Sequence, residues 1–208
     1  MQTRSDENVK GIDVSHWEGD IDWSKVRSEE VQFAYIKASE NTTSIDPNFS
    51  KNIEEAKKAG LLVGAYHFAR PEKYSAEDEA KHFVKLLKSN PTDLMPVLDL
   101  ESPKDPNKIS VSDLVQWVRT FVDYVKKETG RQVMLYTGNW FIDLYQQFQY
   151  DLSDLPIWIA NYGNISAPPD GGGWTQWTVW QYTENGKVDG IDDNVDLNAA
   201  VSLVALKG

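Results

Sequence analysis

The sequence predicts an irregular, TIM-like (β/α) barrel of the α/β class, with eight strands and about five helices. Up to about residue 150, short apolar runs alternate with helical patterns, as in a chain built from βα units. Three further strand patterns then follow with little room for helices between them. Polar and aromatic residues recur at one end of every strand, where such barrels carry their active sites. We therefore expect a barrel whose last strands lack helical cover.

The eight expected strands are short, mainly apolar runs bounded by turn-forming residues. They cover residues 10–15, 33–38, 61–68, 95–101, 132–137, 156–161, 177–182 and 192–197. Because the carboxyl ends of barrel strands meet at one rim, the residues at these ends should lie close together.

Capping residues mark the expected helices. Asp46-Pro47 suggests an N-cap followed by proline at the first helical position. Ser75 begins a pattern typical of a capping box. The longest helix should run from about Ser110 to Thr129, where Gly130 ends it. Shorter helical segments are expected at residues 23–26 and 139–148.

The length of 208 residues fits one domain, so residues 10–208 should form a single catalytic barrel after a polar N-terminal extension at residues 1–9. The polar start contains no signal peptide, and no segment is apolar enough to span a membrane. Cysteine is absent, which excludes disulfides and thiolate metal sites. We expect a monomer without membrane association.

Charge and aromatic content indicate the class of ligand. The formal net charge of −11 argues against nucleic acid, because phosphate binding requires basic surface. Eight Trp and nine Tyr suit stacking on the C–H faces of sugars. Asp189, Asp192 and Asp193 do not have the spacing of a calcium loop, and no metal or other cofactor is expected.

Asp99 and Glu101 end the fourth strand and are spaced i, i+2. Strand side chains alternate between faces, so both carboxyls should project together while Leu98 and Leu100 point away. Neighbouring carboxyls repel, and the more buried one should keep its proton to a higher pH. An acid beside an anion is what glycosidic bond cleavage requires. The simpler alternative is a strand end whose acids face water or cap a helix.

Other strand ends carry four charged or titratable residues. Asp13 and Asp196 could line the cleft or position chain ends through hydrogen bonds. Lys37 could balance the acidic charge, since clustered carboxylates without a cation are costly. His67 has no Ser or Cys nucleophile paired with it and fits a structural or hydrogen-bonding role.

Four uncharged strand-end residues are candidate contacts of a sugar. They are Tyr66, Tyr136, Trp158 and Gln181. Aromatic rings at a cleft can stack on sugar faces, and for the three aromatic residues packing in the core is the alternative.

Seven short segments carry a family resemblance. They are Gly11–Trp17, Tyr35–Glu40, Gly64–Phe68, Pro96–Glu101, Trp158–Tyr162, Trp180–Tyr182 and Val195–Asn198. In this order they resemble the lysozymes of glycoside hydrolase family 25, the Chalaropsis-type group. The resemblance extends from about Lys10 to Ala200 and implies an irregular barrel, in agreement with the strand and helix patterns.

The resemblance implies an N-acetylmuramidase, which hydrolyses the β-1,4 bond between N-acetylmuramic acid and N-acetylglucosamine in peptidoglycan. At matching positions it implies that Glu101 is the general acid, that Asp99 is the assisting carboxylate, and that Asp13 and Asp196 are further acids of the cleft. It also implies action at the cell wall, as a phage endolysin, a bacterial autolysin, a germination enzyme or a secreted lytic protein.

The expected mechanism leaves alternatives open. Glu101, between apolar strand neighbours and near other acids, should be protonated near neutral pH and donate to the leaving oxygen, while Asp99 stays ionised. Asp99 could attack directly or assist the 2-acetamido group of the substrate, and two acids on one strand favour assistance with retention. An inverting route through Asp13 or Asp196 stays open. So do two other functions, a chitinase-like hexosaminidase and a non-catalytic glycan-binding barrel.

Overall fold

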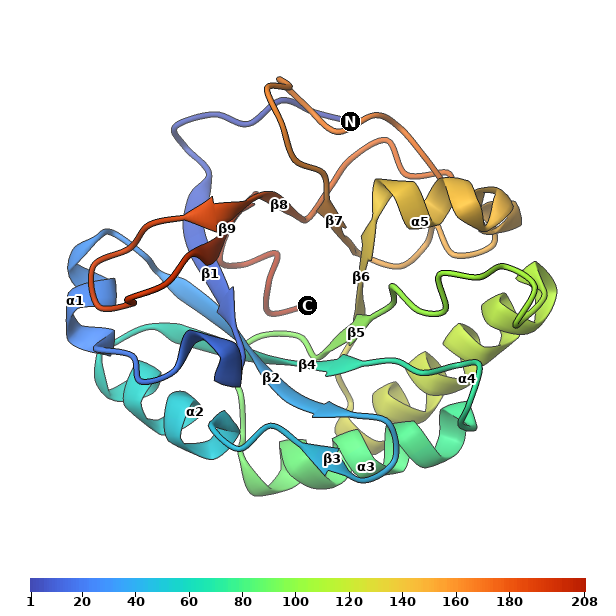
Figure 1. Ribbon diagram of the computed structural model, residues 1–208, viewed down its shortest axis with the longest axis horizontal. Helices are drawn as coiled ribbons and strands as arrows, with labels where there is room; N and C mark the ends of the chain where they lie inside the picture. The colour runs from blue at the N-terminus through green and yellow to red at the C-terminus, as the bar shows by residue number, and fades with distance from the viewer.

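The computed structural model describes residues 1–208 and forms a closed barrel of eight strands with one short additional strand (Figure 1). The barrel strands are β1 (Val9–Val14), β2 (Phe33–Glu40), β4 (Leu62–Phe68), β5 (Val97–Asp99), β6 (Met134–Gly138), β7 (Ile157–Ala160), β8 (Val179–Gly186) and β9 (Val195–Ala200). Their order is β1-β9-β8-β7-β6-β5-β4-β2, and β1 pairs with β2 to close the barrel. The additional strand, β3 (Ser44–Ile45), pairs with the end of β2. The predicted eight-stranded barrel is confirmed.

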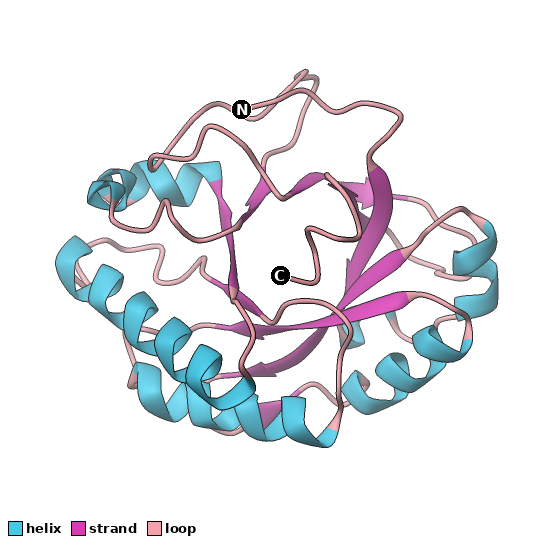
Figure 2. Cartoon of the chain, turned by 180° about the vertical axis from the view of Figure 1, so that it is seen from behind, coloured by secondary structure: helices cyan, strands magenta, loops and turns pink.

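Five α-helices cover part of the barrel (Figures 1 and 2). They are α1 (Trp23–Ser28), α2 (Phe49–Lys58), α3 (Ala76–Ser89), α4 (Val111–Thr129) and α5 (Asn139–Leu144), with 3₁₀ turns at His16–Glu18 and Gln146–Tyr150. Ser75 caps α3 and Gly130 ends α4 in the left-handed conformation, both as predicted, and Ser110, the expected start of α4, is its N-cap. No helix is long and apolar enough to cross a bilayer. No α-helix lies between β7 and β9, so the expected bare last third is confirmed.

The start of α2 differs from the prediction at Asp46-Pro47. The helix begins at Phe49, and its N-cap residue is Asn48, whose side chain makes no capping bond. The buried Asp46 carboxylate instead lies 3.0 Å from the backbone nitrogen and 2.7 Å from the ring Nδ1 of His16. The other carboxylate oxygen, Oδ1, accepts the backbone N–H of Asn48 at 3.0 Å, as an N-cap side chain does. Asp46 therefore both holds the turn after β1 and bonds the backbone just before the helix.

The direction of β9 also departs from a regular barrel. It begins at Val195, not near Asp192, and is antiparallel to both β1 and β8, whereas all other neighbouring barrel strands are parallel. Residues 187–194 are too few for a crossover helix, so the chain returns from β8 as a hairpin. Asp196 consequently reaches the same rim from the amino end of its strand, directly opposite Asp13.

The barrel interior is an apolar layer separate from the one between strands and helices. Tyr35 and Trp158 are buried there with ring centres 4.9 Å apart. Gly64 makes room for them, since a Cβ at this position would lie 2.1 Å from the Tyr35 ring. Leu206 closes the opposite end, where its carbonyl accepts the N–H of Met95 at 2.8 Å, and the C-terminus lies within the ring of strands (Figures 1 and 2). This filling leaves one rim for a cavity.

The first residues of the chain lie against strand β8 and the segment before it, where no helix packs. The Gln2 amide donates to the carbonyl of Trp177 at 2.8 Å and accepts the Trp177 backbone N–H at 2.9 Å. The Arg4 guanidinium lies 3.8 Å from the ring centre of Tyr182. These contacts cover part of the outer face that helices leave bare.

A buried histidine–glutamate pair joins β4 to α3. Nε2 of His67 lies 2.7 Å from Oε2 of Glu79, and its Nδ1 lies 2.8 Å from the hydroxyl of Ser39. Glu79 also accepts the backbone N–H of Arg70 at 3.2 Å. Burial lowers the pKa of His67 to about 3 and raises the pKa of Glu79 to about 8. Near neutral pH the pair is therefore uncharged, with the proton on Glu79.

Glu79→Gln should cost about 1 kcal/mol or less in unfolding free energy, whereas Glu79→Ala should cost about 2–4 kcal/mol. A glutamine can still donate to Nε2 of His67 and accept from Arg70, but alanine leaves both buried groups without partners. Urea denaturation of the two variants measures this difference. Equal losses would show that Glu79 does not act through these hydrogen bonds.

The same pair predicts a pH dependence of stability. The pKa of Glu79 is raised from 4.5 to about 8 in the folded state. The contribution of Glu79 to the unfolding free energy is therefore complete below its ordinary pKa of 4.5 and is lost as pH rises through about 8. Above about pH 7 His67 is neutral in both the folded and the unfolded protein, so its titration no longer offsets that of Glu79. Between pH 7 and 9 the unfolding free energy should fall with pH in the unsubstituted protein and change less in Glu79→Gln. Equal slopes would contradict the assignment of the proton to Glu79.

Candidate active site

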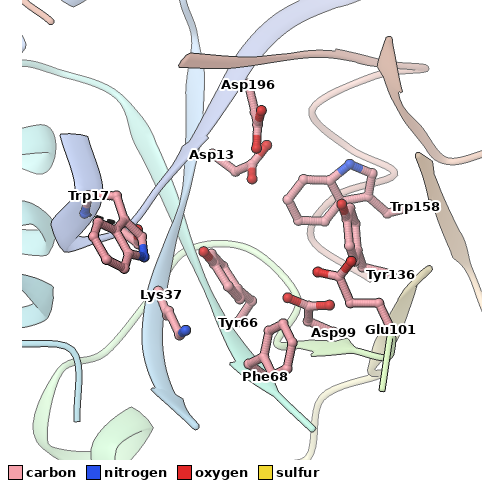
Figure 3. A pocket seen from close by; sticks show the side chains of 11 residues that line it. Asp13, Trp17, Lys37, Tyr66, Phe68, Asp99, Glu101, Tyr136, Trp158 and Asp196 are labelled. Carbon is pink, nitrogen blue, oxygen red and sulfur yellow. Dashed lines mark hydrogen bonds between the residues drawn. The ribbon is translucent and has the colours of Figure 1, made fainter. Parts of the chain in front are cut away.

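Eight of the nine predicted site residues line one cavity of about 200 Å³ at the rim where the parallel strands end (Figure 3). They are Asp13, Lys37, Tyr66, Asp99, Glu101, Tyr136, Trp158 and Asp196. Ser15, Trp17 and Phe68 complete the lining of this central cavity. The polar and aromatic strand ends that the sequence singled out thus converge on one place.

Asp99 and Glu101 project into the central cavity from the end of β5 (Figure 3). Leu98 and Leu100 pack on the other side, in the layer beneath the helices, as the period of two predicts. β5 ends at Asp99, but the N–H of Leu100 still donates to the carbonyl of Tyr136 at 2.9 Å. This bond keeps the following residue in line with the sheet, so the two carboxyls lie side by side.

Asp99 is the more buried acid, which reverses the expectation that Glu101 would be the one kept protonated. Asp99 is 5% exposed, whereas Glu101 has intermediate exposure. Burial, followed by the charge of Glu101, raises the pKa of Asp99 well above its usual range. Burial also raises the pKa of Glu101, but Lys104 and Lys37 oppose that rise. In the free protein the pair therefore shares a proton that the deeper Asp99 holds more tightly.

The carboxyl oxygen Oδ1 of Asp99 is buried and has no hydrogen-bond partner in the protein. A buried polar atom without a partner is costly, typically by about 1–3 kcal/mol. A ligand that brings an N–H group to this oxygen would remove the cost and favour the ionised carboxylate. Asp99 is thus arranged to accept a hydrogen bond from a bound molecule.

Asp13 and Asp196 form a second carboxyl pair, which contacts across β1 and β9. Oδ1 of Asp13 accepts from the amides of Asn198 at 2.7 Å and Gln181 at 2.9 Å. Burial raises the pKa of both acids. The pKa of Asp196 rises further, because the two amide donors stabilise the anion on Asp13 and its charge acts on Asp196. The pair therefore carries one negative charge, on Asp13, with the proton on Asp196.

Gln181 is fully buried and does not line the cavity. Its Oε1 accepts from the hydroxyls of Tyr136 at 2.8 Å and Tyr162 at 2.5 Å, and its Nε2 donates to Asp13 and to Asp196 at 3.1 Å. All of its side-chain polar atoms are used within the protein, so in this arrangement Gln181 has no group free to contact a substrate directly. Gln181 instead positions the tyrosines and the second carboxyl pair relative to each other.

Trp158 forms the floor of the central cavity. The side chain is 1% exposed, its Nε1 donates to Asn198 at 2.8 Å, and the ring of Tyr136 packs edge-on at 4.8 Å. The sequence left open whether Trp158 packs in the core or lines the cavity. In the structure its ring does both. Tyr66 and Tyr136 line the same cavity with intermediate exposure.

Lys37 is paired with Glu40 and not directly with the four acids. Its Nζ lies 3.0 Å from Oε2 of Glu40 and 5.0 Å from the ring centre of Phe68. Its charge nevertheless acts against the raised pKa values of Asp99 and Glu101. Charge balance is thus provided across the cavity, without a direct ion pair.

Trp17, Phe68 and Ser15 line the cavity but were not among the predicted site residues. Trp17 is 76% exposed on the turn that follows β1, an unusual exposure for a large aromatic side chain. A signal was present, since Trp17 closes the first of the segments that carry the family resemblance and directly follows a strand end.

The two carboxyl pairs suit acid–base chemistry on a ligand held between them (Figure 3). No group of three or more His, Asp or Glu side chains is arranged to hold a metal ion. A proton donor and an anion lie within reach of one bound molecule, which is the requirement for cleaving a glycosidic bond.

Comparison with known proteins agrees with this geometry. The chain is 38% identical to Lysozyme M1 of Streptomyces globisporus over 95% of this chain and 71% of that protein. Its fold matches the spore cortex lytic enzyme SleM of Clostridium perfringens with a TM-score of 0.92 at 37% identity, over 99% of this chain and 71% of that one. It matches the lysozyme of Streptomyces coelicolor with a TM-score of 0.85 at 35% identity, over 98% and 97% of the two chains. The family model described as Glycosyl hydrolases family 25 matches residues 12–191, and the chain therefore belongs to this family.

Proposed function

We propose that this protein is a lysozyme, an N-acetylmuramidase that hydrolyses the β-1,4 bond between N-acetylmuramic acid and N-acetylglucosamine in bacterial peptidoglycan. The observation that carries the proposal is the carboxyl pair of β5, with one proton shared and one Asp99 oxygen left without a partner. The lytic relatives support the same class of substrate.

The unpaired oxygen of Asp99 favours assistance by the substrate. The N–H of a 2-acetamido group can donate to this oxygen, and that bond stabilises the Asp99 anion. The shared proton then moves to Glu101, whose pKa is raised by burial. Substrate binding thus produces the division of roles expected from the sequence, although the free protein holds the proton on the deeper acid.

In the first step Glu101 donates its proton to the leaving glycosidic oxygen while the acetamido oxygen attacks the anomeric carbon. The C–O bond breaks, a cyclic oxazolinium ion forms, and Asp99 balances its positive charge. In the second step the Glu101 carboxylate takes a proton from water, and the oxygen of that water opens the ring. Two inversions give net retention of configuration.

The second carboxyl pair and the aromatic lining would hold the sugar in place. Asp13 carries the charge of its pair and is oriented by two amides, so it suits a hydroxyl donor of the ring. We propose that residues 10–208 act as one catalytic domain, as a monomer and outside the cytoplasm, where the wall substrate lies.

Digestion of purified peptidoglycan, followed by borohydride reduction of the products, tests the proposed function. New muramitol ends are expected, and they should be missing with Glu101→Gln. Glucosaminitol ends would assign a different hexosaminidase specificity. No new ends, with wall binding unchanged in Glu101→Gln, would indicate a glycan-binding barrel. Proton NMR of the first product anomer should show the β configuration, and the α anomer would exclude the assisted route.

A further inference from the structure

Two larger cavities open beside the central cavity and share Glu101 with it. The first, named the lysine arm, is about 750 Å³ and is lined from residues 68–73 and 101–108. The second, named the aromatic arm, is about 580 Å³ and is lined from residues 136–143 and 160–162 together with Glu101, Lys104 and Glu184. The connection from β5 to α4 separates them, between the connection from β4 to α3 and helix α5 (Figure 1). Glu101, the proposed proton donor, therefore lines all three cavities.

The aromatic arm suits an uncharged sugar. Trp140 is 45% exposed in its wall, and Tyr162 and Tyr136 add further ring surface. Asn139 and Asn161 supply amide groups. Rings beside amides are the side chains that stack on pyranose faces and bond hydroxyls.

The lysine arm has the opposite chemistry. Phe68 is its one large apolar side chain, and four cationic side chains line it, namely Arg70, Lys73, Lys104 and Lys108. Arg70 is already paired with Glu40 at the edge of the arm, which fixes its position. Lys73 and Lys108 have no carboxylate within salt-bridge distance and are exposed.

Two acids of the lysine arm accept hydrogen bonds within the protein. Asp105 accepts from the backbone N–H and the side-chain amide of Asn107, and Glu72 accepts from the Ser102 hydroxyl at 3.4 Å. These donors are uncharged and leave the carboxylate charges in place, so the four cations of the lining face three acids, namely Glu72, Glu101 and Asp105. The arm is therefore a weakly positive space on a chain of net charge −11, directly beside a central cavity that gathers four acids. Such a space selects a carboxylate-bearing group over a neutral one.

A muramoyl residue bound in the central cavity carries three large substituents that must extend out of it. The glycan continues in two directions, and a lactyl ether at C3 bears a carboxylate, either free or linked to an acidic stem peptide. Trp17 lies across the central cavity from Glu101 and can accept one direction of the glycan (Figure 3). The aromatic arm fits the uncharged leaving sugar, so the lysine arm is left for the acidic substituent.

We propose that the lysine arm binds the carboxylate-bearing C3 substituent of the muramoyl residue and so selects muramic acid over glucosamine. This inference rests on the proposed function and names the residues that give its substrate preference. Lys73 and Lys108 are the binding groups, and Lys104 stands at the junction of the two arms.

The test uses soluble glycan strands that carry stem peptides, compared with the same strands after their free carboxyls have been converted to neutral methylamides. Lys73→Gln/Lys108→Gln should raise KM on the acidic strands about 5- to 10-fold, as expected for the loss of two exposed charge contacts. The loss should appear in KM and not in kcat, and the KM difference between acidic and amidated strands should disappear. The matched control is Lys85→Gln/Lys127→Gln, two exposed lysines late in α3 and α4 with the same change in net charge.

Three results would overturn the inference. They are an unchanged KM on acidic strands, an equal rise on acidic and amidated strands, and an equal rise in the control variant, which would assign the effect to net charge. Failure of the proposed function looks different, because the unsubstituted protein would then release no muramic reducing ends from either substrate. That result would remove both proposals, whereas the first three remove only the role of the lysine arm.

Discussion

Glu101→Gln is expected to lower kcat on peptidoglycan by about 10²–10⁴-fold, the range typical of a general acid. The substitution keeps the shape of the side chain but removes the proton that the leaving oxygen requires. Glu101 is only partly buried and lines open cavities, so the variant should fold normally. KM should change little, because the side chain acts on the transition state more than on the bound sugar.

A substrate with an activated aryl leaving group separates this role from a general loss of structure. Such a group departs without protonation, so Glu101→Gln should retain far more of its activity on an aryl glycoside than on the wall. A variant that keeps more than a tenth of its activity on peptidoglycan would mean that another group supplies the proton. An equal loss on both substrates would mean that Glu101 binds or positions the sugar.

Local sequence patterns were sufficient to predict the barrel and the main carboxyl pair. Asp99 and Glu101 share a face because strand side chains alternate, and this rule needs no tertiary information. Ser75 and Gly130 likewise act through bonds to their own helices, so the sequence predicts them correctly.

Local patterns are less informative where contacts between residues far apart in the sequence determine the environment of a side chain. Gln181 is buried because its partners Asp13 and Tyr136 lie 168 and 45 residues away in sequence. Asp46 bonds the backbone at the start of α2, but its second bond, to His16 from 30 residues away, cannot be seen in the local pattern. The greater burial of Asp99 over Glu101 also depends on how neighbouring strands close around β5. A pattern that extends over a few residues contains none of this information.

Asp99→Asn is expected to lower kcat by about 10²–10³-fold, the typical cost of removing one group that stabilises charge in a transition state. Asparagine keeps the size of the side chain and can still accept a hydrogen bond from the acetamido N–H. It cannot balance the charge of the oxazolinium ion, and it no longer exchanges a proton with Glu101. The loss should persist on the aryl glycoside, because the attack on the anomeric carbon still needs assistance. This is the opposite of the behaviour expected for Glu101→Gln.

Two further measurements on Asp99→Asn distinguish assistance from direct attack. A muramic acid thiazoline mimics the cyclised acetamido group, so it should inhibit the unsubstituted protein and bind Asp99→Asn about 10²-fold more weakly, in line with the loss of kcat. If Asp99 acts only by assistance, added azide should neither restore the activity of Asp99→Asn nor give an α-glycosyl azide as product. Such a product would show that azide replaces a carboxylate nucleophile, and Asp99 would then attack the sugar itself. The unpaired oxygen of Asp99 would in that case face the anomeric carbon and not the acetamido N–H.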